Sequence, residues 1–258
     1  MSNKTLITGA SSGIGEVYAE RLARRGHDLV LVARSADKLE ALAVRLRAET
    51  GVSVETLPAD LSDAADLAKV EARLRDDTAI DTLVNNAGIA GESTLIEADP
   101  DYLTGMINLN IVAVTRLTTA IAPRLAAHGA GTIVNLTSVT ALMPDGFTAV
   151  YPATKAFVLA FTEALQAELG PKGVRVQAVL PGITRTAIWQ EEQLAHIPAE
   201  MMMDVREMVD AALAGLDQGE TITIPSLADH GDFDAYITAR AALRPNLSRD
   251  RAAARYRA

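Results

Sequence analysis

The sequence reads Thr8-Gly9-Ala10-Ser11-Ser12-Gly13-Ile14-Gly15 directly after a short apolar segment, Lys4 to Thr8. A helical pattern of apolar residues begins near Gly15 and stops at Gly26. A strand, a glycine-rich turn and a helix in this order are the usual beginning of a βαβ unit. This stretch therefore predicts that the chain starts an α/β fold.

Similar apolar segments recur between longer helical stretches along the rest of the chain. The predicted strands are Lys4 to Thr8, Asp28 to Ala33, Val52 to Leu57, Asp81 to Asn85, Gly131 to Leu136, Val174 to Leu180 and Thr221 to Ile224. Alternating strands and helices favour right-handed βαβ units and a parallel sheet between two helical layers. We expect an α/β, Rossmann-like, doubly wound sheet of about seven strands, in one domain over residues 1–258.

The glycine-rich turn has the features that bind the phosphates of a dinucleotide. Gly9 permits a tight turn, Gly13 lets backbone N–H groups approach the pyrophosphate, and Gly15 lets helix and strand pack closely. The N-terminus of the helix adds aligned donors and a positive dipole end. An ordinary glycine turn is the alternative interpretation. The predicted contacts are Gly9, Ser11, Ser12, Gly13, Ile14 and Gly15.

The end of the second predicted strand indicates which dinucleotide binds. NAD-binding sites place an Asp or Glu here for the ribose 2′-hydroxyl, but this sequence has Ala33 followed by Arg34. A guanidinium pairs with a 2′-phosphate, which a carboxylate repels. We therefore predict NADP(H) in preference to NAD(H). The alternative is a solvated Arg34 in a turn, with Ser35 capping the next helix.

A tyrosine and a lysine one helical turn apart provide the predicted acid–base chemistry. Tyr151 and Lys155 share a helix face because they stand four residues apart, and Pro152 suits the first turn. A nearby ammonium favours the phenolate, so we expect it to lower the phenol pKa. Ser138 follows a strand at the carboxyl edge of the sheet, where its hydroxyl can bond a substrate oxygen.

Further motifs accompany these residues. They are the spacing G-x3-G-x-G, Asn85-Asn86-Ala87-Gly88, the set Ser138, Tyr151 and Lys155, and Pro181-Gly182 followed by Thr186. On these motifs the sequence resembles the short-chain dehydrogenase/reductase family over nearly its whole length. The resemblance implies an oxidoreductase that moves hydride between the nicotinamide and a carbonyl or secondary alcohol, as a carbonyl reductase or alcohol dehydrogenase does.

The resemblance also implies roles for residues that the patterns alone leave as turns and loops. It implies that Lys155 holds the nicotinamide ribose and that an Asn in a central helix is a fourth catalytic residue. Asn110 matches the family better than Asn108, which is alternatively a buried or interface amide. The other implied cofactor contacts are Asp60 and Leu61 at the adenine, Asn86, Ala87 and Gly88 along the adenosine, and Pro181, Gly182, Ile183 and Thr186 at the carboxamide.

The segment 187–208 interrupts the alternation of strands and helices, so we expect it to be a lid over the substrate. The residues expected around the pocket are Met143, Phe147, Trp189 and Met201, with Glu191 and Glu192 nearby. Because this set is largely apolar, we expect a neutral, hydrophobic ketone, aldehyde or secondary alcohol.

Composition excludes several other classes of protein. The formal net charge of −9 disfavours a nucleic-acid partner, and the absence of cysteine excludes disulfides and thiolate chemistry. The four histidines have no metal-ligand spacing, so we expect no metal. We found neither a signal peptide nor an apolar run long enough for a membrane span, and so expect a cytoplasmic protein without a membrane partner.

Two predicted helices, Tyr102 to Leu125 and Pro152 to Leu169, are apolar on more than one face. Subunit association explains this pattern, and the family resemblance implies a homotetramer or homodimer; burial within a monomer is the alternative. Two other functions compete with the dehydrogenase interpretation. One is a non-catalytic NADP(H)-sensing protein, and the other is an epimerase or dehydratase on the same fold.

Overall fold

The structure is a computed structural model that describes residues 3–91, 94–145, 148–186 and 197–257. It divides into two compact units, Met1–Pro225 and Ser226–Ala258. The second unit contains helix α9 (His230–Ala242) and short 3₁₀ turns at Arg244–Asn246 and Ala254–Tyr256. The predicted sheet lies in the first unit, and a single domain over all 258 residues stays a prediction.

The first unit is built on a seven-stranded sheet in the order β3-β2-β1-β4-β5-β6-β9. Every neighbouring pair is parallel. The strands are β1 (Lys4–Thr8), β2 (Asp28–Ala33), β3 (Val54–Pro58), β4 (Ile80–Asn85), β5 (Gly131–Leu136), β6 (Val174–Val179) and β9 (Ile222–Thr223). The predicted Rossmann-like, doubly wound sheet is therefore confirmed.

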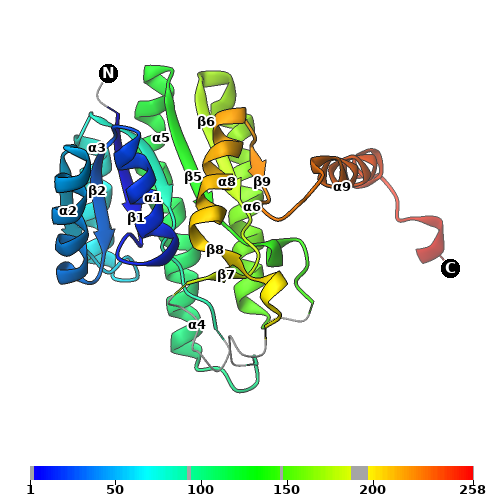
Figure 1. Cartoon of the computed structure of the whole chain (residues 1–258). Helices are drawn as coiled ribbons and strands as arrows, with labels where there is room; N and C mark the ends of the chain where they lie inside the picture. Colours follow the sequence, from blue (N-terminus) through cyan, green and yellow to red (C-terminus); the bar gives the residue numbers. More distant parts are fainter. Residues whose placement is uncertain (1–2, 92–93, 146–147, 187–196, 258) are drawn as a thin grey trace. The chain divides into compact units, whose positions relative to one another are not determined.

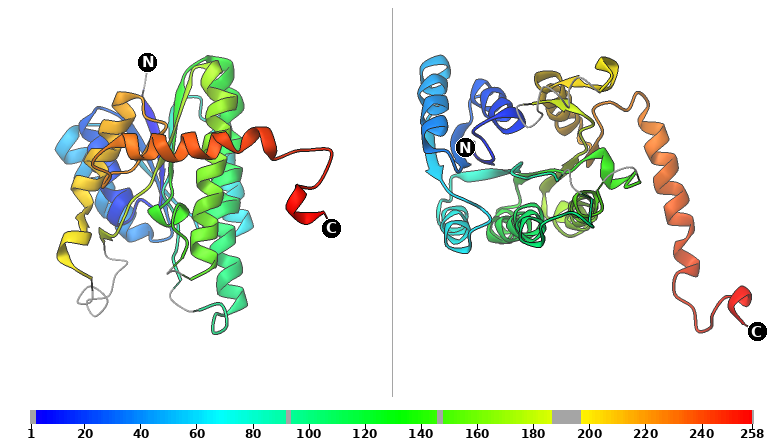
Figure 2. Two further views of the ribbon diagram at one scale, coloured as in Figure 1. Left: turned by 90° about the vertical axis from the view of Figure 1, so that its right-hand side faces the viewer. Right: turned by 90° about the horizontal axis from the view of Figure 1, so that it is seen from below.

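Helices cover both faces of this sheet, as Figures 1 and 2 show. Helices α1, α2 and α8 lie on one face, and α3, α5 and α6 lie on the other. Each layer has its own apolar core against the sheet. The bounds are α1 (Gly13–Arg24), α2 (Ala36–Thr50), α3 (Ala64–Asp76), α4 (Pro100–Ile107), α5 (Val114–His128), α6 (Val150–Leu169) and α8 (Val205–Gln218).

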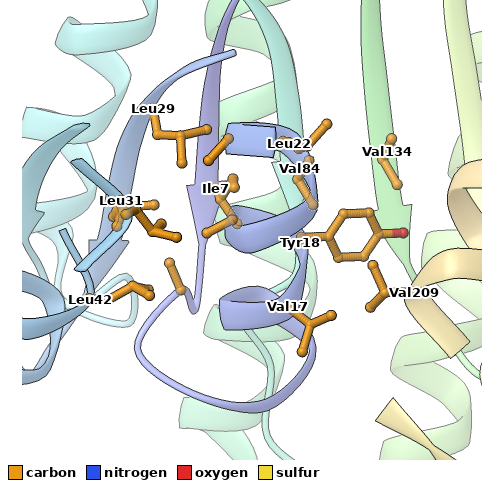
Figure 3. Packing of buried hydrophobic residues seen from close by; sticks show 14 of the residues in the cluster. Ile7, Val17, Tyr18, Leu22, Leu29, Leu31, Leu42, Val84, Val134 and Val209 are labelled. Carbon is orange, nitrogen blue, oxygen red and sulfur yellow. The ribbon is translucent and has the colours of Figure 1, made fainter. Parts of the chain in front are cut away.

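Packing of the first layer centres on α1. Tyr18 is fully buried, and Figure 3 shows its ring beside Val134 of β5 and Val209 of α8. Val17 and Leu22 continue the buried face of α1. Each such side chain contributes about 1.5–3 kcal/mol by leaving water. This packing fixes α1, and with it the turn that precedes it.

One long helical run crosses the opposite layer. It joins α4, a π-helical segment (Asn108–Ala113) and α5, and covers Pro100–His128. By length and composition this run is able to span a membrane, which differs from our expectation from the sequence. Its Leu117, Ile121 and Leu125 are buried against the sheet. The core thus accounts for part of its apolar character, since Ile107 and Val112 of the run are exposed, and the absence of a membrane partner stays a prediction.

The segment expected to form a lid is partly core. Residues 187–196 lie outside the described residues. A 3₁₀ turn at Ala199–Met201 follows, and then β8 (Met203–Asp204) pairs with β7 (Thr184–Arg185). The end of the expected lid is wrong, because helix α8 begins at Val205 and buries Met208. The irregular segment therefore ends by Asp204, and its role as a lid stays a prediction.

A buried carboxylate joins three helices of the first layer. Glu20 of α1 accepts from Arg206 of α8 at 2.7 Å and pairs with Arg45 of α2 at 2.8 Å. Burial raises the pKa of Glu20, but the bonds from the two arginines outweigh it and hold the pKa below its ordinary value of 4.5. The ionised form therefore stabilises the fold above about pH 4.5, and this contribution is lost as the pH falls through the folded-state pKa.

We predict that Glu20→Gln lowers the free energy of unfolding by about 1–2 kcal/mol at neutral pH, because charge-assisted hydrogen bonds are lost. The difference from wild type should narrow once Glu20 is protonated in both states. Urea unfolding at neutral and acidic pH measures the difference in the free energy of unfolding between the two proteins. Glu200→Gln, at an exposed position, is the control. A pH-independent difference would contradict this assignment.

Candidate active site

The carboxyl ends of the parallel strands meet at one edge of the sheet, where such folds bind their ligands. Figure 1 shows the turn after β1, the loops after β4 and β5, and the β7–β8 pair all reaching this edge. The predicted glycine turn, Ser138 and the start of α6 belong to these segments. The fold thus brings together residues that are far apart in the sequence.

The glycine turn is closely packed against the end of β4. The Asn86 amide Nδ2 donates to the Thr8 carbonyl at 2.9 Å and to the Gly9 carbonyl at 3.2 Å. Gly9 has φ +65°, and a Cβ there would lie 2.7 Å from Asn86 Nδ2. A Cβ on Gly15 would overlap the Gly9 carbonyl oxygen. Glycine is therefore required at both positions by backbone conformation and close approach.

Other contacts fix the residues on either side of the turn. Thr8 Oγ1 accepts from the backbone N–H groups of Asn86 at 2.9 Å and Ala87 at 3.0 Å, so both residues are fixed beside the turn. A Cβ on Gly13 would lie 3.3 Å from Thr186 Cγ2. The predicted carboxamide contact Thr186 therefore lies next to the predicted phosphate contact Gly13. The turn leads into the N-terminus of α1, which begins at Gly13, and a helix N-terminus is favourable for binding pyrophosphate.

The residues predicted for the adenosine lie beyond β2 and β3. Arg34 is exposed, and Leu61 is buried in the core of the second layer. A hydrogen bond from the Ser62 hydroxyl is the main cause that lowers the pKa of Asp60; burial opposes it and the nearby Arg34 charge assists it. Arg34 and Asp60 therefore lie within electrostatic reach of each other, as binding of one adenosine requires.

The structure brings the predicted catalytic residues together. Ser138 lies close enough to Tyr151 for its hydroxyl to act on the phenol and lower the pKa of Tyr151. Lys155 Nζ lies 5.7 Å from the centroid of the Tyr151 ring and donates to the Leu136 carbonyl at 3.0 Å. Both Ser138 and Lys155 are buried. The hydroxyl, the phenol and the ammonium thus form one group between the end of β5 and the first turns of α6.

The pKa of the phenol differs from the sequence expectation. Burial raises the pKa of Tyr151 above its ordinary value of 10.0, and the Ser138 hydroxyl acts in the opposite direction. Burial also lowers the pKa of Lys155 to about 8. The predicted lowering of the phenol pKa by the ammonium is therefore wrong for this structure, because desolvation penalises both charged forms.

Asn110 lies in the π-helical segment and is buried. Its Nδ2 donates to the Ile89 carbonyl at 2.9 Å and to Thr154 Oγ1 at 3.1 Å, and its Oδ1 accepts from Ile89 N at 3.0 Å. A Cβ on Gly88 would lie 3.1 Å from Asn110 Oδ1 and 3.4 Å from Lys155 Nζ. Asn110 therefore adjoins the lysine, as the family resemblance implies; Asn108 is half-buried.

The loop after β6 closes the site from the other side. The Pro181 carbonyl accepts from Val139 N at 3.0 Å, and the Ile183 carbonyl accepts from Met203 N at 2.9 Å. Gly182 lies between them, and its carbonyl accepts from Thr184 Oγ1 at 3.2 Å. These bonds hold the predicted carboxamide contacts beside the segment that carries Ser138.

The described part of the substrate side is mostly apolar, with Asp99 and Thr148 as polar members of its lining. A hollow of about 360 Å³ is lined by Gly91, Tyr102 and Val150 among others. Met143 and Met201 are exposed by 67% and 59%. The other predicted pocket residues, Phe147, Trp189, Glu191 and Glu192, lie outside the described residues. Within the described ranges, no cluster of His, Asp or Glu is arranged to hold a metal ion.

Three threonines of the site were missed by sequence reasoning. Thr8 anchors the loop after β4, Thr137 Oγ1 donates to the Lys155 carbonyl at 2.7 Å, and Thr154 Oγ1 donates to the Tyr151 carbonyl at 2.8 Å. Their signal in the sequence is weak, because hydroxyl residues are common at strand ends and at the starts of helices.

Comparison with known proteins agrees with this geometry. Residues 3–196 match the short chain dehydrogenase family. The very-long-chain 3-oxoacyl-CoA reductase-A of Danio rerio is 38% identical over 185 residues, which cover 70% of this chain and 58% of that protein. The chain therefore spans less than two thirds of the length of this relative.

Solved structures match nearly the whole chain. A short-chain dehydrogenase from Sphingobium yanoikuyae in complex with NADPH has a TM-score of 0.96 and 50% identity, covering 99% of this chain and 100% of that one. A bulky-bulky ketone specific alcohol dehydrogenase from Comamonas testosteroni has a TM-score of 0.92 and 46% identity, covering 98% of each chain. The chain therefore belongs to the short-chain dehydrogenase family.

Proposed function

We propose that this protein is an oxidoreductase that uses NADP(H) to interconvert a neutral, hydrophobic ketone or aldehyde and the corresponding alcohol. The observation that carries the proposal is the joint placement of Ser138, Tyr151 and Lys155 beside the glycine turn at one edge of the sheet. These groups can bind a carbonyl oxygen and move a proton to it, next to a turn that would hold the phosphates of a dinucleotide.

Each residue has a distinct task in this reaction. NADPH, when bound, supplies the hydride that reduces the carbonyl carbon. Tyr151 donates its phenolic proton to the carbonyl oxygen, and Ser138 bonds the same oxygen as negative charge develops there. Lys155 places a positive charge near the phenol and would hold the ribose hydroxyls of the nicotinamide half if the cofactor were bound. Asn110 holds the loop after β4 next to Lys155. In alcohol oxidation the phenolate accepts the proton.

Arg34 carries the proposed preference for NADP(H). We predict that Arg34→Ala weakens NADPH binding by about tenfold and leaves NADH binding nearly unchanged, because an exposed charge-assisted contact is lost. Fluorescence titration with both nucleotides measures this. Arg24→Ala, at another exposed arginine, is the control. If the substitution weakened the binding of NADPH and NADH equally, Arg34 would support the fold and would not contact the 2′-phosphate.

The proposed substrate class rests on the apolar surroundings of the site. Gly91, Tyr102, Val150, Met143 and Met201 carry no charge, and the charged residue that lines the hollow is Asp99, whose carboxylate disfavours an anionic substrate. The Comamonas testosteroni enzyme, described as specific for bulky-bulky ketones, supports an uncharged ketone with large substituents. Very-long-chain 3-oxoacyl-CoA reductases are also relatives, so an acyl thioester is the alternative to exclude.

A substrate panel tests the proposed function. The purified protein is incubated with NADPH and either bulky neutral ketones, keto acids or 3-oxoacyl-CoA, while the loss of absorbance at the nicotinamide band is followed. Faster turnover of neutral ketones supports the proposal. Faster turnover of keto acids or acyl-CoA would overturn the substrate class, and NADPH binding without any turnover would indicate a sensing protein.

We also propose a cytoplasmic homotetramer or homodimer that associates through α5 and α6. Phe157 of α6 is exposed, as is Val112 in the π-helical segment that precedes α5. A groove of about 420 Å³ between α5 and α6 is lined partly by Ala122, Phe161 and Leu165. Exposed apolar surface of this kind is typical of subunit contacts. Light scattering of the purified protein tests the assembly, and a monomer would contradict it.

A further inference from the structure

Three consecutive residues at the end of β5 contact one turn of α6. The Leu136 carbonyl accepts from Lys155 Nζ, and the Thr137 hydroxyl donates to the Lys155 carbonyl at 2.7 Å. The Ser138 side chain lies close enough to the Tyr151 phenol to lower its pKa. The first and third contacts reach side chains. The middle contact reaches the helix backbone, so it fixes the position of the whole turn relative to the strand.

Thr137 connects the sheet to α6. Its backbone N–H donates to the Val179 carbonyl of β6 at 2.8 Å, and its side chain is buried. The Lys155 carbonyl lies inside α6, where the helix itself offers a backbone donor four residues on. The carbonyl oxygen has a second lone pair for the Thr137 hydroxyl. This hydrogen bond is therefore not needed to complete the helix; it ties the helix to the sheet.

We propose that Thr137 is a positioning residue whose hydroxyl sets the distance between the Ser138 hydroxyl and the Tyr151 phenol. The inference rests on the proposed function, because it assigns Tyr151 as the acid and base. Thr137 acts through Ser138 and Tyr151, because its own hydroxyl donates to the backbone of α6.

Loss of this hydroxyl has a defined consequence for proton transfer. Without it the strand end and the helix turn are held less closely, and the interaction of Ser138 with the Tyr151 phenol weakens. Lys155 is the charged group that faces the phenol, from the same helix, and its own bond to Leu136 is unchanged. Since the Ser138 interaction opposes the effect of burial, its weakening raises the pKa of Tyr151. Alcohol oxidation, which uses the phenolate, then requires higher pH.

The test compares Thr137→Val, which removes the hydroxyl at nearly constant volume, with Thr137→Ser, which keeps it. For Thr137→Val we expect kcat to fall by about tenfold with little change in KM for the alcohol. We expect the midpoint of the pH profile for oxidation to rise by about half a unit. Thr137→Ser should restore both. The control is Thr50→Val, which removes a similar bond to the Leu46 carbonyl, 2.7 Å long, in α2.

A spectroscopic titration separates this inference from the proposed function. The ultraviolet titration of the Tyr151 phenol is obtained by subtracting the Tyr151→Phe spectrum, and it requires no turnover. If wild type fails to reduce ketones, the proposed function fails, and the titration still decides the role of Thr137. An unchanged phenol midpoint in Thr137→Val, or no rescue by Thr137→Ser, would overturn the inference. Should Thr137→Val fold poorly, Thr137→Ala removes the same hydroxyl and must give the same shift.

Discussion

Replacing Tyr151 with Phe is expected to lower kcat for ketone reduction by about 10²–10⁴-fold. The substitution removes one oxygen atom from a buried ring and keeps the ring itself, so the fold and the glycine turn should persist. The reason for the loss is that the phenol is the proton donor placed between Ser138 and Lys155. NADPH affinity should stay near that of wild type.

Steady-state kinetics and fluorescence titration of NADPH on the same preparations measure the two quantities. Tyr18→Phe is the matched control, because Tyr18 is also a buried phenol but lies in the core between α1 and the sheet. Its kinetics should equal those of wild type. A Tyr151→Phe enzyme that keeps more than a tenth of wild-type turnover would require another proton donor.

Replacing Lys155 with Met is the second substitution with a large expected effect. It removes the buried ammonium and its hydrogen bond to the Leu136 carbonyl, at 3.0 Å, while keeping an unbranched side chain of similar length. We expect turnover to fall by about 10²–10⁴-fold, because the phenol loses the charge that faces it. We also expect NADPH binding to weaken by about tenfold, because the contact proposed for the ribose hydroxyls is lost.

Lys155 also predicts a pH dependence. Burial lowers its pKa to about 8, so the ammonium is present below about pH 8 and is lost as the pH rises through that value. Ketone reduction by wild type should therefore decline above about pH 8, and Lys155→Met should lack this decline. Lys69→Met, at an exposed lysine on α3, is the control. If the rate of ketone reduction declined above about pH 8 in Lys155→Met as it does in wild type, the titration of another group would cause the decline.

The fold could be predicted from the sequence because its signals are local. The strand at Asp28–Ala33 was placed correctly since an apolar segment buried from both faces is distinctive. Boundaries were less accurate: α6 begins at Val150, two residues before the predicted Pro152. The core helix α8 was not separated from the expected lid, because the burial of Met208 depends on distant strands.

The site could be predicted only in part, because local patterns reveal spacing and turns but not contacts between distant segments. Tyr151 and Lys155 were found from their helical spacing, and Gly9 from the turn that it makes. The raised pKa of Tyr151 follows from burial, which no local pattern encodes. The contact of Thr137 with Lys155 joins residues 18 positions apart and is specified by the packing of α6 on the sheet.

The central claim is that hydride passes between NADPH and a neutral ketone while Tyr151 supplies the proton. The most direct measurement is a reduction with NADPH deuterated at the transferring position of the nicotinamide, followed by mass analysis of the alcohol. Our account predicts deuterium at the carbinol carbon with wild type and almost no alcohol with Tyr151→Phe. Alcohol without deuterium, or equal yields from both proteins, would contradict it.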